Sequence, residues 1–138
     1  MVKDAMCDEK GISLISVLLV DHNSSFLRIS KECLNIETGL KVETALSVDE
    51  ALIKLREKKT DVIVSEIMSP DAARFEFLKT FWSEDKTIPV IVFTIEDESD
   101  VADEAMKMGA SGFIGKFGDP SLVFSKLKNC IVSALREN

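Results

Sequence analysis

The sequence predicts an α/β protein, a doubly wound (βα)5 sandwich built on a five-stranded parallel sheet. Apolar runs of strand length alternate along the chain with amphipathic segments of helix length. Three of these runs are apolar throughout their middles, which is typical of strands covered on both faces. The chain has 138 residues, 46% of them hydrophobic and 30% charged, so it can bury one core and is too apolar to be disordered.

The predicted strands are short apolar runs bounded by polar or turn residues, namely 14–20, 40–45, 61–66, 88–94 and 112–115. The most apolar of them, 14–20, is too short to cross a bilayer, and we therefore expect no membrane partner. Residues 1–12 are polar and without pattern, and we expect them to form a flexible arm. Residues 13–138 are expected to form one domain.

Capping residues and apolar spacing predict the first two helices. Asn23 or Ser24 can cap the first helix, which is expected to end near Gly39. Its predicted apolar stripe is Phe26, Ile29 and Cys33. The capping box "SVDE" at 47–50 precedes the second helix, with the stripe Ala51, Leu52 and Leu55.

The remaining helices follow from the same signals. The third carries Phe75, Leu78 and Trp82, and the fourth carries Val101, Ala105 and Met108 before a closing Gly109. Asp119 followed by Pro120 starts the fifth, because proline suits the first helical position. Its stripe is Phe124, Leu127, Ile131 and Leu135. We interpret all these stripes as core.

Charge and cysteine content limit the function classes. The net charge of −7, with lysines and arginines scattered, argues against a nucleic-acid partner. Cys7, Cys33 and Cys130 are far apart and are expected to be reduced thiols. The first residues lack the basic and then apolar run of a signal peptide, and we expect a cytoplasmic protein.

Polar residues follow the predicted strands at the edge where a doubly wound sheet binds ligands. Parallel strands bring their carboxyl ends to the same edge, so residues that follow different strands converge. They are Asp21 and His22 after the first strand, Glu66 after the third, Thr94 at the end of the fourth, and Lys116 after the fifth. The fold therefore predicts one pocket with carboxylates, an imidazole, a hydroxyl and an ammonium.

Four motifs in register resemble the receiver domain of two-component response regulators. They are "VLLVDHNSSFL", "DVIVSEIMSP", "PVIVFT" and "GASGFIGK", and the resemblance covers roughly residues 14–137. It implies the strand order 2-1-3-4-5 of flavodoxin-like and CheY-like proteins. It also implies that residues 13–138 form a receiver domain.

In this family a histidine kinase passes a phosphoryl group to an aspartate at the end of the third strand. The matching positions are Glu66 for the phosphoacceptor, Asp21 and His22 for the acidic pair, Lys116 for the lysine that pairs with the phosphoryl group, Thr94 and Phe113 for the switch residues, and the Met68 carbonyl for a metal ligand. The resemblance assigns a Mg²⁺ ion to the acidic positions, where it would neutralise charge during phosphoryl transfer.

Two of these positions depart from the family pattern. His22 replaces an acid that would touch the metal, and nitrogen is a poor ligand for Mg²⁺. Glu66 is longer than aspartate by one methylene, which moves its carboxylate by roughly 1.5 Å where about 0.5 Å is tolerated. We expect a weak or absent Mg²⁺ site at Asp21, Glu66 and Met68, and no cofactor.

Two interpretations of Glu66 remain open. Its carboxylate either partly mimics a phosphorylated aspartate or forms only a structural ion pair with Lys116. His22 is either an exposed residue without a task or a metal ligand or pH sensor.

Two further departures concern the backbone. Phe117 follows Lys116 where the family has a proline, and the bond is expected to be trans or strained because a cis bond without proline is costly. The segment "DAARFEF" lacks the usual glycine, and we expect the third helix to start early.

The leading functional prediction is an atypical receiver module that is not an enzyme and is not phosphorylated in the usual way. Its fourth helix, fifth strand and fifth helix are expected to serve either for binding to a histidine kinase or an effector, or for forming a homodimer. The alternative is a conventional phosphorelay receiver that still accepts a phosphoryl group. An enzyme or flavin carrier is disfavoured, because "DHNSSF" lacks the glycines that cradle phosphate.

Overall fold

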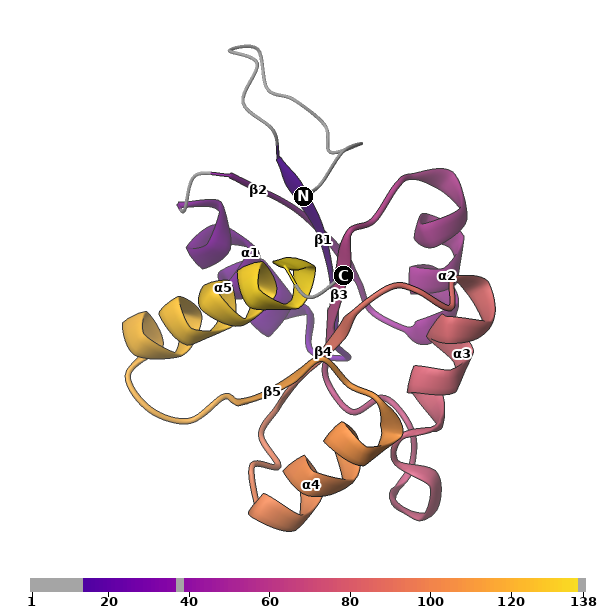
Figure 1. The fold of residues 1–138 in the computed structure, drawn as a ribbon. Coiled ribbons are helices and arrows are strands. Elements are labelled where there is room, and N and C mark those ends of the chain that lie inside the picture. Colours follow the sequence, from indigo (N-terminus) through magenta and orange to yellow (C-terminus); the bar gives the residue numbers. More distant parts are fainter. Residues whose placement is uncertain (1–13, 37–38, 137–138) are drawn as a thin grey trace.

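A five-stranded parallel sheet forms the centre of the molecule (Figure 1). The computed structural model describes residues 14–36 and 39–136. The strands lie in the order β2-β1-β3-β4-β5, and every neighbouring pair is parallel. They are β1 (Ile15–Val20), β2 (Leu40–Ala45), β3 (Val62–Ser65), β4 (Val90–Thr94) and β5 (Gly112–Gly115). The predicted fold class and strand order are confirmed, and each strand lies within its predicted range.

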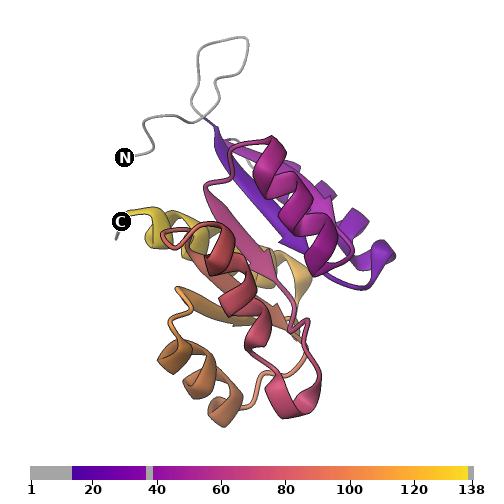
Figure 2. The ribbon, with the colours of Figure 1, turned by 90° about the vertical axis from the view of Figure 1, so that its right-hand side faces the viewer.

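Helices cover both faces of the sheet. They are α1 (Ser24–Asn35), α2 (Val48–Glu57), α3 (Glu76–Glu84), α4 (Ser99–Met108) and α5 (Pro120–Arg136). Buried side chains of α1 and α5 pack on one face, and those of α2, α3 and α4 pack on the other, which faces the viewer in Figure 2. Among the described residues, no helix has both the length and the apolar content that a membrane crossing needs.

The predicted helix caps are observed. The Asn23 side chain accepts a hydrogen bond from the Phe26 N–H at 2.9 Å, and the Ser47 hydroxyl accepts one from the Glu50 N–H at 3.0 Å. Gly109 closes α4 in the left-handed conformation with φ of 111°, which a residue with a side chain rarely adopts. The first helix ends at Asn35, and residues 37–38 lie outside the described part of the chain.

The predicted apolar stripe of the first helix is wrong by one position. The residues of α1 that are buried are Leu27, Ser30 and Leu34, whereas Ile29 is 49% exposed. The cause is Ser30, a polar residue in the middle of the buried face that interrupts the apolar pattern. Spacing of apolar residues alone therefore selected the neighbouring face.

The segment after β3 also differs from its prediction. Residues Asp71–Ala73 form a separate 3₁₀ turn, and α3 begins at Glu76 rather than early. The Ser69 hydroxyl accepts a hydrogen bond from the Phe77 N–H at 2.9 Å, which satisfies a donor in the first turn of the helix. The bond between Lys116 and Phe117 is trans, as expected without proline.

The flexible arm predicted at residues 1–12 lies outside the described residues. The boundary of the domain at residue 13 therefore stays a prediction.

Candidate functional site

Three polar residues are positioned by backbone hydrogen bonds that extend the parallel sheet beyond its strands. The N–H groups of Asp21, Glu66 and Lys116 each donate to a carbonyl of the neighbouring strand, at 3.1, 2.9 and 2.9 Å. Each residue directly follows the last residue of β1, β3 or β5. The three side chains therefore meet at one edge of the sheet, as the sequence predicted.

Lys116 joins the two acids. Its Nζ donates to Asp21 Oδ2 at 2.6 Å and to Glu66 Oε2 at 2.7 Å. The side chains of Lys116, Asp21 and Glu66 are only 9%, 9% and 13% exposed. We call these three residues the Lys116 cluster. At this burial the charges attract one another more strongly than on an open surface, because water screens them less.

The Glu66 carboxylate receives donors from three strand ends. Its Oε1 accepts the Ile67 N–H at 2.7 Å, and its Oε2 accepts the Ile95 N–H at 3.3 Å as well as Lys116. Two backbone N–H groups and an ammonium that converge on one point form a binding site for an anion. In this chain the anion is the chain's own carboxylate.

Two aromatic rings surround the Lys116 ammonium. Its Nζ lies 4.2 Å from the centre of the Phe26 ring and 5.7 Å from that of Phe93, within cation–π range. Apolar spacing in the sequence placed Phe26 in a core stripe and did not connect it with Lys116. Sequence spacing held no signal for this contact, because it joins α1 to the segment after β5.

The other predicted residues do not contribute to the Lys116 cluster. Thr94 is fully buried, and its Oγ1 accepts the Glu96 N–H at 3.0 Å. His22 is exposed. Phe113 and Met68 are partly buried and pack against the core beneath α2, α3 and α4.

The donor set does not fit Mg²⁺. Mg²⁺ prefers octahedral oxygen ligands, and the exposed His22 supplies nitrogen in place of a carboxylate. The carboxylates of Asp21 and Glu66 are both bound to one ammonium. Within residues 14–36 and 39–136, no three His, Cys, Asp or Glu side chains are grouped so that they could hold a metal ion.

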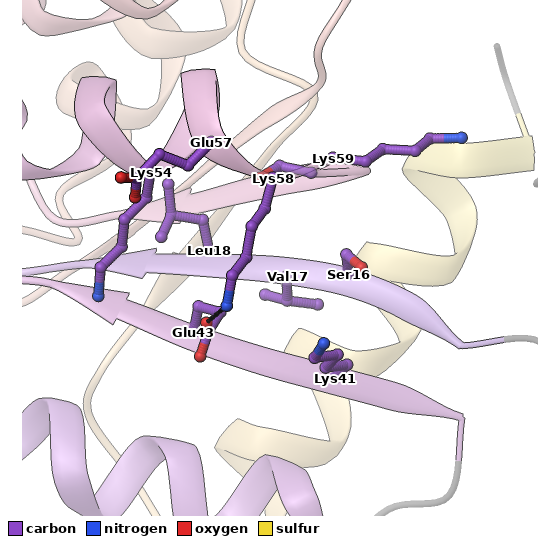
Figure 3. A pocket seen from close by; sticks show the side chains of 10 residues that line it. Ser16, Val17, Leu18, Lys41, Glu43, Lys54, Glu57, Lys58 and Lys59 are labelled. Carbon is purple, nitrogen blue, oxygen red and sulfur yellow. Dashed lines mark hydrogen bonds and ion pairs between the residues drawn. The ribbon is translucent and has the colours of Figure 1, made fainter. Parts of the chain in front are cut away.

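A cleft lies away from this edge, beside the amino-terminal half of β1 (Figure 3). This cleft of about 90 Å³ lies between β1, β2 and the end of α2, and its polar lining includes Lys41, Glu43, Lys54, Glu57, Lys58 and Lys59. None of the predicted site residues lines it.

Lys58 bridges the cleft to β2. Its Nζ lies 2.8 Å from Glu43 Oε1, and this hydrogen bond holds the pKa of Glu43 below its usual value. The same contact raises the pKa of Lys58 above its usual value. The ion pair is exposed, with the side chain of Lys58 59% accessible and that of Glu43 35%.

The fold, together with the Lys116 cluster at the edge of its sheet, is typical of one class of signalling protein. Residues 17–128 match the family model described as the response regulator receiver domain. The chain belongs to this family, whose members are signalling modules of two-component systems.

Individual relatives agree with this assignment. The chain is 30% identical over 118 residues to a protein of Porphyra purpurea described as the probable transcriptional regulator ycf29, covering 84% of this chain and 56% of the relative. It is 30% identical over 112 residues to the chemotaxis protein CheY of Thermotoga maritima, covering 80% of this chain and 92% of the relative. The chain thus spans about half the length of ycf29 and nearly all of that CheY.

A solved structure shows the same fold. The chemotaxis response regulator CheY4 of Vibrio cholerae superposes with a TM-score of 0.70 at 30% identity, covering 86% of this chain and 99% of CheY4.

Proposed function

We propose that this receiver domain signals through protein–protein contacts and is not phosphorylated in the usual way. One observation carries the proposal: the Glu66 carboxylate binds Lys116 and the N–H groups of Ile67 and Ile95. These are donors suited to the oxygens of an anion. Because the Glu66 carboxylate already occupies these donors, a phosphoryl group that enters the site would have to displace the carboxylate from them.

The hydrogen bonds of Glu66 also bear on the two interpretations of this residue. Contact with the Ile95 N–H links Glu66 to the segment between β4 and α4, which a simple pair with Lys116 would not require. This link supports Glu66 as a partial, permanent substitute for a phosphorylated aspartate. The carboxylate carries about one negative charge where a phosphate carries nearly two.

The proposed contact surface consists of α4, β5 and α5, with β5 between the two helices in Figure 1. Exposed apolar side chains on or beside it are Met106 (48%), Phe117 (63%) and Leu122 (61%). We propose a histidine kinase or an effector as partner, and a second copy of the chain as a homodimer partner. Nucleic acid and membranes are not proposed as partners. Location in the cytoplasm stays a prediction from the sequence.

The proposal is tested by incubating the protein with Mg²⁺ and a small acyl phosphate, followed by intact mass measurement. We expect no phosphoryl adduct on the unaltered chain and none on Glu66→Asp alone, because His22 still lacks the metal-binding carboxylate. The double variant Glu66→Asp/His22→Asp should regain labelling. An adduct on the unaltered chain would support the conventional phosphorelay receiver and contradict the proposal.

The substitute role of Glu66 needs a separate measurement. Glu66→Gln keeps the size of the side chain and removes its charge. We expect it to weaken dimerisation, measured by analytical ultracentrifugation, or binding to a cognate kinase. If the unaltered chain and Glu66→Gln associate equally well, only the interpretation of Glu66 as a structural ion-pair partner remains.

A further inference from the structure

We infer that the Lys116 ammonium is the resident cation of this site and takes the place between the two carboxylates that a divalent ion would need. The inference rests on the proposed function, because a site without phosphoryl transfer has no need of a metal. Beyond the proposed function, it says which positive charge balances the two carboxylates.

The surroundings of Lys116 match the donors of an ammonium group. An ammonium has three N–H donors. Two of them are directed at Asp21 Oδ2 and Glu66 Oε2, at 2.6 and 2.7 Å. The ring of Phe26 lies 4.2 Å from Nζ, and an aromatic face attracts a cation. Carboxylates and aromatic rings together therefore hold the ammonium.

The carboxylate oxygens are also engaged on their other sides. Asp21 Oδ1 accepts the Asn23 N–H at 2.9 Å, and Glu66 Oε1 accepts the Ile67 N–H at 2.7 Å. All four oxygens of the two acids thus accept a hydrogen bond. A metal ion would have to compete with backbone donors as well as with Lys116.

Displacement of Lys116 by a metal is unfavourable because of burial. The lysine side chain is 9% exposed and lies against Phe26 and Phe93. Without its carboxylates, the ammonium would remain in apolar surroundings with no opposite charge, which is strongly unfavourable for a buried ion. His22 adds no negative charge that would help a metal to offset this cost.

Metal binding without any phosphoryl donor tests the inference. Mn²⁺ binding is measured by isothermal titration calorimetry, and the effect of Mg²⁺ on the thermal unfolding midpoint is recorded in parallel. We expect no Mn²⁺ binding at millimolar concentrations and no Mg²⁺-dependent shift for the unaltered chain. Lys116→Met frees both carboxylates and should raise Mn²⁺ affinity at least about tenfold.

A matched control separates this effect from the loss of one positive charge. Lys126→Met removes an exposed lysine of α5 and should bind Mn²⁺ no better than the unaltered chain. Circular dichroism checks that each variant is folded. If Lys116→Met is not folded, Lys116→Gln replaces it, because its amide still donates to the carboxylates without a charge.

Two results would overturn the inference: Mn²⁺ binding by the unaltered chain at millimolar concentrations or below, or no gain in affinity by a folded Lys116 variant. Neither result depends on labelling by an acyl phosphate. A chain that binds Mn²⁺ and is not labelled contradicts only this inference. A chain that is labelled contradicts the proposed function itself.

Discussion

Two lysine–carboxylate contacts of nearly equal length lie in different regions of the molecule. Lys116 Nζ is 2.7 Å from Glu66, and Lys58 Nζ is 2.8 Å from Glu43. The side chains of the first pair are 9% and 13% exposed, and those of the second are 59% and 35% exposed. Distance alone therefore does not decide how much an ion pair contributes to stability.

The two pairs differ in burial and in the number of additional partners. The Lys116 cluster includes a second acid, backbone donors and two aromatic rings, so removal of one member leaves charges buried without compensation. Lys58 and Glu43 remain in contact with water when they separate, because both are exposed. We therefore expect the cluster to be sensitive to substitution and the cleft pair to be tolerant.

The largest effect is expected from Lys116→Met. This change leaves Asp21 and Glu66 close together without a cation, and it should lower the free energy of unfolding by about 3–5 kcal/mol. Urea denaturation followed by circular dichroism measures this change. The matched control, Lys58→Met, should cause a much smaller loss. Equal losses for both variants would remove the contrast between the two regions.

A smaller effect is expected from Glu66→Gln. The amide oxygen can still accept the Ile67 N–H, whereas the charge that pairs with Lys116 is lost and only Asp21 remains as its acid. We expect a destabilisation of about 1–3 kcal/mol in urea denaturation. A variant as stable as the unaltered chain would show that Asp21 alone compensates Lys116.

A third substitution, Phe26→Leu, separates the aromatic ring from the charges. It keeps all members of the Lys116 cluster and removes the ring at 4.2 Å. A loss of about 0.5–2 kcal/mol is expected, since cation–π contacts are stronger at desolvated sites. Phe124→Leu is the control, because Phe124 packs edge-on against Phe93 and is not one of the two rings, Phe26 and Phe93, that lie at the ammonium. The same substitution is also made in a Lys116→Met background. An equal loss in free energy of unfolding in both backgrounds would show that the ring does not act through the charge of Lys116.

The smallest effect concerns the pH dependence of the cleft pair. The folded pKa of Glu43 is lowered, so the stabilisation is present above the unfolded pKa of Glu43 and is lost as pH falls through the folded pKa. The folded pKa of Lys58 is raised, so the stabilisation is present below its unfolded pKa and is lost as pH rises through the folded one.

The unaltered chain should therefore exceed Lys58→Met slightly in stability near neutral pH, and the difference should shrink at both acid and alkaline pH. Unfolding midpoints measured across pH at low salt check this, because salt screens exposed pairs. A difference that stays constant across pH would mean that the lysine acts through packing of its stem alone.

The architecture, and the edge of the sheet that carries the candidate site, follow from the sequence alone. Alternating strand and helix patterns depend on local periodicity, and parallel strands place the residues that follow them at one edge. For this reason the sequence predicts that Asp21, Glu66 and Lys116 lie close together. The roles assigned to Thr94, Phe113 and His22 stay predictions.

The contacts that these residues make depend on packing between elements of the folded molecule. The buried face of α1 was misassigned because Ser30 occupies a position that packing, and not hydrophobicity, turned inward. The contact of Phe26 with Lys116 and the link from Glu66 to the Ile95 N–H join segments far apart in the chain. Such contacts depend on side-chain direction and burial across several elements, which no local pattern in a sequence specifies.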